Sequence, residues 1–253
     1  MASTTLQLSN GLRLATAEDI EVLAGIMKAG AATTEEDQYC RPYARQHSSD
    51  TYYSFRAWFT QLVHDDNTIL LAIEDELEET EDFTPSEGER GVVGFAHIKL
   101  KSSHPRASQF GTDWDDLPCF PTPQQRPQVH REHELMYHNT TTELEEAHFQ
   151  GCDMTLETLI VDPDYRRRGH GAKLVQWLLD LATTDNVKVG VVATRDGIPL
   201  YEKLGFDGVA DASIVGDEIS PNGVKIKAMK YTTIKQATIE THQTVITDTN
   251  ERS

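Results

Sequence analysis

The chain has 253 residues, of which 23 are lysine or arginine and 41 are aspartate or glutamate, so its formal net charge is −18 at pH 7. This length favours one domain, and so acidic a chain argues against nucleic acids and anionic membranes as main partners. Residues 1–10 lack the pattern of a secretory signal, no apolar run approaches a membrane span, and the three cysteines form no CxxC pair. We therefore expect a cytoplasmic protein, with a homodimer left open.

The N-terminal half predicts a mixture of helices and strands. In chain order, these are a short strand at 12–15, a helix that follows the capping-box sequence at 16–19, a second helix at 51–64, and strands at 68–73 and 92–100. The segment 30–49, between the two helices, is polar and predicts no regular element.

Two insertions interrupt this pattern. The first, at 74–90, is heavily acidic and is interpreted as a solvated hairpin extension in preference to a functional acidic patch. The second, at 102–150, contains prolines and little periodicity, which is typical of a lid or a mobile surface loop. Its later part, 128–149, could contain a helix.

After Cys152 the pattern becomes regular. Strands are predicted at 154–161, 187–193, 206–214 and 224–231, with helices at 172–182 and 199–204. Alternating strands and helices indicate an α/β layer fold with an at least partly parallel sheet. We expect one domain over residues 1–235 and a polar C-terminal tail at 236–253.

The segment from Val161 to Leu174 has the character of an anion-binding turn. A strand ends at Val161, three arginines and two glycines follow, and a helix begins. The first N–H groups of a helix lack partners within the helix, and glycines let a phosphate approach them closely. The sequence matches neither the Walker A pattern nor the complete dinucleotide fingerprint.

Two motifs resemble the GCN5-related N-acetyltransferase (GNAT) superfamily. Arg166-Arg-Arg-Gly169-His-Gly171 is similar to its acyl-CoA loop, [RQ]-x-x-G-x-[GA], and Gly197-Ile-Pro-Leu-Tyr201-Glu-Lys-Leu-Gly205-Phe206 resembles its (L/F)-Y-x-x-x-G-F segment. The close resemblance covers residues 154–206. It implies an α/β (α+β) fold with a mixed central sheet, splayed at the acyl-CoA site and flanked by helices, with a long insertion before the central strand.

The resemblance also implies acetyl-CoA as co-substrate and direct acyl transfer without a metal. The turn would bind the pyrophosphate through backbone N–H groups, the end of the preceding strand would pair with the pantetheine arm, and Thr194 replaces an asparagine that often faces that arm. The implied cofactor-binding residues are Leu159, Ile160, Val161, Arg166, Arg167, Arg168, Gly169, His170, Gly171, Ala172 and Thr194.

Two residues are candidates for catalysis. Tyr201 would return a proton to the leaving thiolate as general acid, against the alternative that its ring only packs under the sheet. Glu157 shares side-chain parity with Leu159 and Val161 on the central strand. It could accept a proton from the attacking amine, position a cationic substrate, or pair with a lysine.

The remaining histidines and cysteines give no catalytic or metal site. The cluster of His130, His133 and His138 lacks the HExxH spacing, so no metal is expected, and Cys152 is interpreted as buried packing. The expected function is acetyl transfer to a primary amine of a small molecule, bound by 30–49, 102–150 and 216–223. The alternatives are a protein lysine or N-terminal acetyltransferase and a non-catalytic acyl-CoA-binding module.

Overall fold

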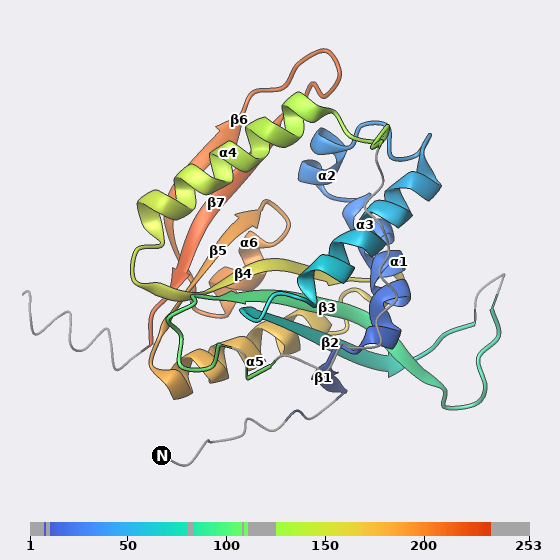
Figure 1. Cartoon of the computed structure of the whole chain (residues 1–253), viewed down its shortest axis with the longest axis horizontal. Coiled ribbons are helices and arrows are strands. Elements are labelled where there is room, and N and C mark those ends of the chain that lie inside the picture. Colours follow the sequence, from blue (N-terminus) through green and yellow to red (C-terminus); the bar gives the residue numbers. More distant parts are fainter. Residues whose placement is uncertain (1–7, 9–10, 80–82, 108, 111–124, 234–253) are drawn as a thin grey trace, which may run out of the picture.

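Seven strands form one mixed sheet in the order β1-β2-β3-β4-β5-β7-β6 (Figure 1). The computed structural model describes residues 8, 11–79, 83–107, 109–110 and 125–233. The strands are β1 (Leu12–Leu14), β2 (Thr68–Glu76), β3 (Arg90–Leu100), β4 (Cys152–Val161), β5 (Lys188–Thr194), β6 (Asp207–Ile214) and β7 (Val224–Tyr231). Among these strands only β4 and β5 pair in parallel.

The helices are α1 (Ile20–Ala31), α2 (Glu35–Cys40), α3 (Ser48–Leu62), α4 (Arg131–His148), α5 (His170–Asp185) and α6 (Ile198–Lys203), with 3-10 turns at Ala17–Asp19 and Pro163–Tyr165. The predicted elements are present with ends shifted by a few residues. None of the helices in the described ranges has both the length and the apolar composition that a bilayer crossing requires.

Helices cover both faces of the sheet (Figure 1). In β2, Ile69 and Leu71 pack into the core beneath α5, whereas Leu70 and Ala72 pack into the core beneath α1 and α3. This alternation is the period of two that a strand buried on both faces must show. On the same face as α1 and α3, α4 lies over β5, β6 and β7 (Figure 1).

The N-terminal capping box is confirmed, because the backbone N–H of Thr16 donates to the Asp19 carboxylate. The expectation of no regular structure at 30–49 is wrong, since α2 lies there. Its local cause is a second cap: Thr34 accepts a hydrogen bond from the Asp37 N–H, and acidic residues occupy the first turn. The cap residue and the acidic first turn are visible in the sequence, so α2 could have been predicted from them.

Both insertions contain regular structure in their described parts. The acidic segment continues β2 to Glu76 and begins β3 at Arg90, so it extends a hairpin. The insertion at 102–150 carries α4, as its later part suggested. Residues 80–82, 111–124 and the predicted tail at 236–253 lie outside the described residues.

Helix α1 approaches the end of β4 closely enough to require a glycine. A Cβ atom added at Gly30 would overlap the buried Ile160 side chain, whereas one added at Gly25, earlier in the same helix, would meet nothing within 4 Å. Ile160 is β-branched and cannot turn aside easily. We expect Gly30→Ala to lower the free energy of unfolding by about 1–3 kcal/mol.

The matched control is Gly25→Ala, which should raise the free energy of unfolding by up to about 1 kcal/mol through helix propensity alone. Urea unfolding followed by circular dichroism measures both variants. Equal stabilisation by the two substitutions would show that α1 does not pack against β4 as closely as described.

Candidate functional site

The sheet opens between its two central strands. Pairing of β4 with β5 runs from Cys152 to Leu156 and then stops, while β4 continues to pair with β3 as far as Val161. From residue 157 onward, the backbone of β4 therefore has no partner strand on its β5 side. This is the splayed sheet that the resemblance implied, and it offers extended backbone to a ligand at 159–161.

A β-bulge marks the same point. Thr158 pairs with His97 and Leu156 pairs with Ile98, which leaves Glu157 as an extra residue in β4. A bulge breaks the alternation of side chains along a strand and re-aims one of them. The site therefore begins where β4 both leaves β5 and changes register against β3.

The bulge corrects the predicted orientation of Glu157. Leu159 packs into the core beneath α5, whereas the charges acting on Glu157 come from Glu145 of α4 and Lys99 of β3, on the opposite face. The side chains of Glu157 and Leu159 therefore lie on opposite faces of the sheet. Desolvation and repulsion by Glu145 raise the pKa of Glu157 to about 7, although Lys99 opposes the shift. A carboxyl group with that pKa can accept a proton near neutral pH.

The turn before α5 leaves its backbone donors free. Within the described residues, no N–H group from 167 to 172 donates a hydrogen bond to the protein. Arg167 and Gly169 have φ angles of +66° and +88°, and a Cβ atom at Gly169 would point into open space. Free N–H groups at the start of a 16-residue helix form an anion-binding site.

The Arg166 side chain is held by hydrogen bonds within the protein. Arg166 donates to the Val161 carbonyl, to Thr33 Oγ1 and to the Gly30 carbonyl, so it ties the end of α1 to the end of β4. Its backbone N–H is also bonded, to Pro163. We infer that Arg166 positions the site instead of binding phosphate through its guanidinium.

The first part of the acidic segment 74–90 contacts the turn before α5. Asp75 contacts His170 Nε2 at 2.9 Å, and Glu78 pairs with Arg168 at 2.6 Å. The Glu78 N–H donates to the hydroxyl of Tyr165, whose ring lies under Arg168. The interpretation of 74–90 as only a solvated hairpin is thus wrong for its first part, which partly neutralises the cationic turn.

Tyr201 lies on α6, beyond the end of β5. Its side chain is 6% exposed, its ring packs at 5.5 Å from that of Phe206, and its hydroxyl bonds to no described residue. Burial and the charge of Glu36 raise the pKa of Tyr201 well above its usual value, so the hydroxyl keeps its proton at neutral pH. Thr194 ends β5 at the opening of the sheet.

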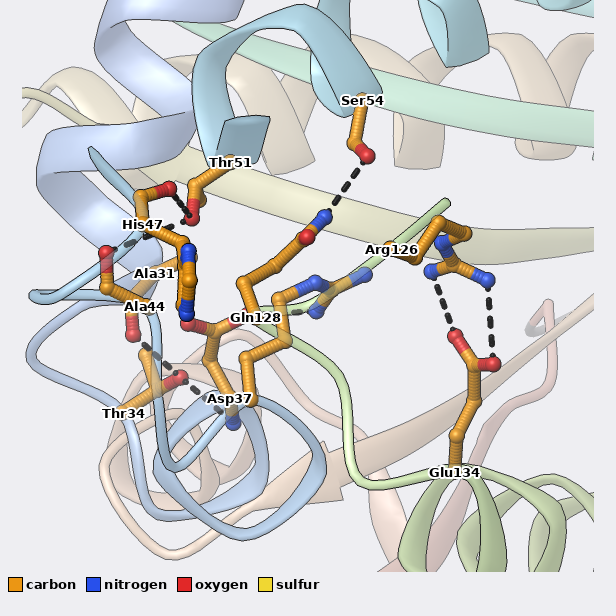
Figure 2. A network of polar contacts seen from close by, with 11 residues as sticks. Ala31, Thr34, Asp37, Ala44, His47, Thr51, Ser54, Arg126, Gln128 and Glu134 are labelled. Carbon is orange, nitrogen blue, oxygen red and sulfur yellow. Dashed lines mark hydrogen bonds and ion pairs between the residues drawn. The ribbon is translucent and has the colours of Figure 1, made fainter. Parts of the chain in front are cut away.

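A cavity of about 490 Å³ is lined by residues of α1, α2, α3 and α4. Most of its lining comes from α2, α3 and α4, and Arg126 contributes from the segment that precedes α4. Figure 2 shows how that segment is held: Gln128 donates to Ser54 of α3, and Arg126 makes two hydrogen bonds to Glu134. The cavity has the size of a small-molecule site.

Two of the three segments expected at an acceptor pocket line this cavity. Residues from 30–49 and 102–150 contribute, but 216–223 does not. Instead, Asp217 in that loop contacts His133 Nε2 at 2.8 Å, and the other ring nitrogen of His133 meets the Tyr39 carbonyl. The described residues contain no group of three or more metal-ligating side chains, and Cys152 is buried in the core beneath α4.

Sequence reasoning missed Glu36, which lines the cavity from α2. Its Oε2 atom is buried without a hydrogen-bond partner in the described structure. Desolvation, together with the nearby Asp37 and Asp196, raises its pKa to about 7. No local signal distinguishes Glu36 from the other acidic residues at 35–37, because only packing of α2 against distant elements buries it.

A mixed sheet that opens at its parallel strand pair, with an anion-binding turn at the start of the next helix, defines the GNAT fold. The model of the acetyltransferase (GNAT) family matches residues 32–206. The chain therefore belongs to this family of acetyl-CoA-dependent acetyltransferases.

Known proteins agree with this assignment. An acetyltransferase of Stachybotrys chartarum is 28% identical over 223 residues, which cover 87% of this chain and 90% of the relative. A 48-residue stretch, 19% of this chain and 17% of the relative, is 42% identical to the uncharacterised N-acetyltransferase YitH of Bacillus subtilis. The crystal structure of histone acetyltransferase HPA2 and related acetyltransferase from Corynebacterium glutamicum superposes with a TM-score of 0.53 at 18% identity, covering 88% of this chain and 95% of that one.

Proposed function

We propose that this protein transfers an acetyl group from acetyl-CoA directly to a primary amine of a small molecule. The observation that carries the proposal is the row of free N–H groups at 167–172, which follows the opening between β4 and β5. A cavity of small-molecule size among α1, α2, α3 and α4 supports it. Arg126 lines the cavity from a segment that Gln128 attaches to Ser54 of α3, and this attachment favours a small acceptor over a protein lysine or N-terminus. The proposal keeps the cytoplasmic location expected from the sequence and requires no metal.

Binding of the acyl donor follows from the backbone. The N–H groups at 167–172 would meet the pyrophosphate, and the unpaired edge of β4 at 159–161 would pair with the amides of the pantetheine arm. Thr194, on the facing strand, would contribute a hydroxyl to that arm. A backbone N–H at the end of β4 would stabilise negative charge on the thioester oxygen during attack.

Proton transfer is assigned to two side chains. Glu157 accepts a proton from the attacking ammonium, directly or through water, and the free amine forms a C–N bond with the carbonyl carbon. As the C–S bond breaks, Tyr201 gives its proton to the departing sulfur, and the proton that the nitrogen loses on becoming an amide restores the tyrosine hydroxyl through solvent. The raised pKa values of both groups suit these roles, because the base is then poised near neutral pH and the acid is fully protonated.

The direct test is release of free thiol by the purified protein, with acetyl-CoA and a set of primary amines. Acetyl-CoA binding is measured separately by isothermal titration. Amine-dependent thiol release supports the proposal. Binding without release by any amine would favour the non-catalytic module, and a folded protein that does not bind acetyl-CoA would contradict the proposal.

Replacement of Glu157 by glutamine should lower kcat/KM by about 100-fold or more, because the base is lost. In the wild type, kcat/KM should rise with pH through about 7 and then level off, since the carboxylate form is the active one. The groups that face Glu157 are Glu145 and Lys99, so Glu145→Gln should move the midpoint to lower pH by removing repulsion. An unchanged pH profile in Glu157→Gln would remove Glu157 from the mechanism.

A further inference from the structure

The cavity contains one carboxylate whose charge is not balanced. Among the charged lining residues, Arg41 pairs with Asp37 and Arg126 pairs with Glu134. Glu36 forms no ion pair with any described residue. The Thr34 hydroxyl and the Glu36 backbone N–H hydrogen-bond its carboxylate, but its buried Oε2 atom has no hydrogen-bond partner. A buried carboxylate without a counter-charge destabilises a fold. A bound cation would supply the missing charge.

Glu36 lies close to the reaction centre. Its neighbour on α2, Glu35, bonds to Arg195 at 3.2 Å, which joins α2 to the loop between β5 and α6. Tyr201 follows Arg195 by six residues and lies on α6. The negative charge of Glu36 contributes to the raised pKa of the Tyr201 hydroxyl. A cation held by Glu36 would therefore be near the acid that serves the leaving thiolate.

The remaining wall of the cavity is largely apolar. Helices α1 and α3 contribute Met27, Phe55, Ala57 and Trp58 to the lining. Trp58 is fixed by edge contacts with Phe59 and His97. Flat and aliphatic walls of this kind bury the hydrocarbon part of a ligand, and aromatic faces also tolerate an adjacent cation.

We propose that Glu36 binds the ammonium group of the acceptor and thereby selects primary amines with an apolar aliphatic or aromatic body. This inference rests on the proposed acetyl transfer and names its substrate class. Glu36 compensates the charge of the ammonium until Glu157 takes a proton from it, while Met27, Phe55 and Trp58 bury the body. Amines with several hydroxyl groups, such as amino sugars, are then poor acceptors.

The test compares Glu36→Gln with the wild type, using 2-phenylethylamine and hexylamine as acceptors and glucosamine as a polar competitor. We expect the KM for both apolar amines to rise about 10- to 100-fold, the range of a lost hydrogen bond to a charged group. The Kd for acetyl-CoA should change less than about threefold. Glu35→Gln is the matched control, since Glu35 only pairs with the exposed Arg195, and its KM values should stay at those of the wild type.

A structural role for Glu36 would give a different pattern. Inhibition by 2-phenylethanol, the uncharged counterpart of the amine, should be equal in the wild type and Glu36→Gln, so only the preference for ammonium over hydroxyl is lost. The variant should also melt at the same or a higher temperature, because an unpaired buried charge has been removed. A lower melting temperature with equal losses for every ligand would overturn the inference.

Failure of the inference is separable from failure of the proposed function. If the wild type acetylates 2-phenylethylamine and Glu36→Gln does so with the same KM, only the inference is wrong. If the wild type shows no turnover, thermal stabilisation by 2-phenylethylamine still tests it: stabilisation of the wild type but not of Glu36→Gln supports ammonium binding, and equal or absent stabilisation contradicts it.

Discussion

Replacement of Gly171 by glutamate should weaken acetyl-CoA binding by about 100-fold or more, equivalent to about 3 kcal/mol. The new side chain would start from the first turn of α5, next to the free N–H groups where the bound pyrophosphate is expected, and its negative charge would repel that group. Isothermal titration with acetyl-CoA measures the effect.

The substitution is designed to leave the fold intact. A Cβ atom at Gly171 would meet Leu200 and Leu159 at 3.5 and 3.8 Å, which are ordinary contacts, and an acidic residue in the first turn favours a helix. Gly171→Ala is the control and should bind acetyl-CoA within about threefold of the wild type, since it adds volume without charge. If Gly171→Glu bound acetyl-CoA normally, the turn would not be the phosphate site.

Tyr201→Phe should reduce kcat by about 100-fold or more while the Kd for acetyl-CoA changes little. The phenylalanine keeps the ring contact with Phe206, and the lost hydroxyl has no hydrogen-bond partner in the described structure. The protein should therefore fold normally and bind its donor, but the leaving thiolate would depart without a proton. Steady-state kinetics of thiol release measure kcat, and titration measures binding.

Tyr231→Phe provides the matched control for this experiment. Like Tyr201, Tyr231 packs its ring against Phe206, with 5.7 Å between the ring centroids. Tyr231 has no assigned role in the reaction. Its kcat should equal that of the wild type. Wild-type kcat in Tyr201→Phe would leave Tyr201 as a packing residue, the alternative that the sequence already presented.

The local parts of the site were predictable from sequence. The turn before α5 follows from two glycines and a following helical stripe, and the strand-to-helix step that carries Tyr201 follows from the motif that ends at Phe206. Both features depend on residues close together in the chain. Their backbone geometry is determined by neighbours within one strand and one helix.

What could not be predicted depends on distant partners. The bulge at Glu157 is a property of the register between β3 and β4, so an alternation rule applied to β4 alone gave the wrong face. Arg166 and Arg168 are engaged by groups more than 80 residues away in sequence. Glu36 became significant only because folding buries it beside a cavity lined by three other helices.

Arg166 has a consequence for how the two substrates meet. Its guanidinium holds the last turn of α1, on the acceptor side, and the last carbonyl of β4, on the donor side, in one set of hydrogen bonds. In the proposed reaction, these hydrogen bonds and the packing of Gly30 against Ile160 together set the spacing between the donor side and the acceptor side. If the two substrates bind as proposed, an acceptor that shifts α1 would strain the strand that receives the donor, and the two binding free energies would be coupled reciprocally.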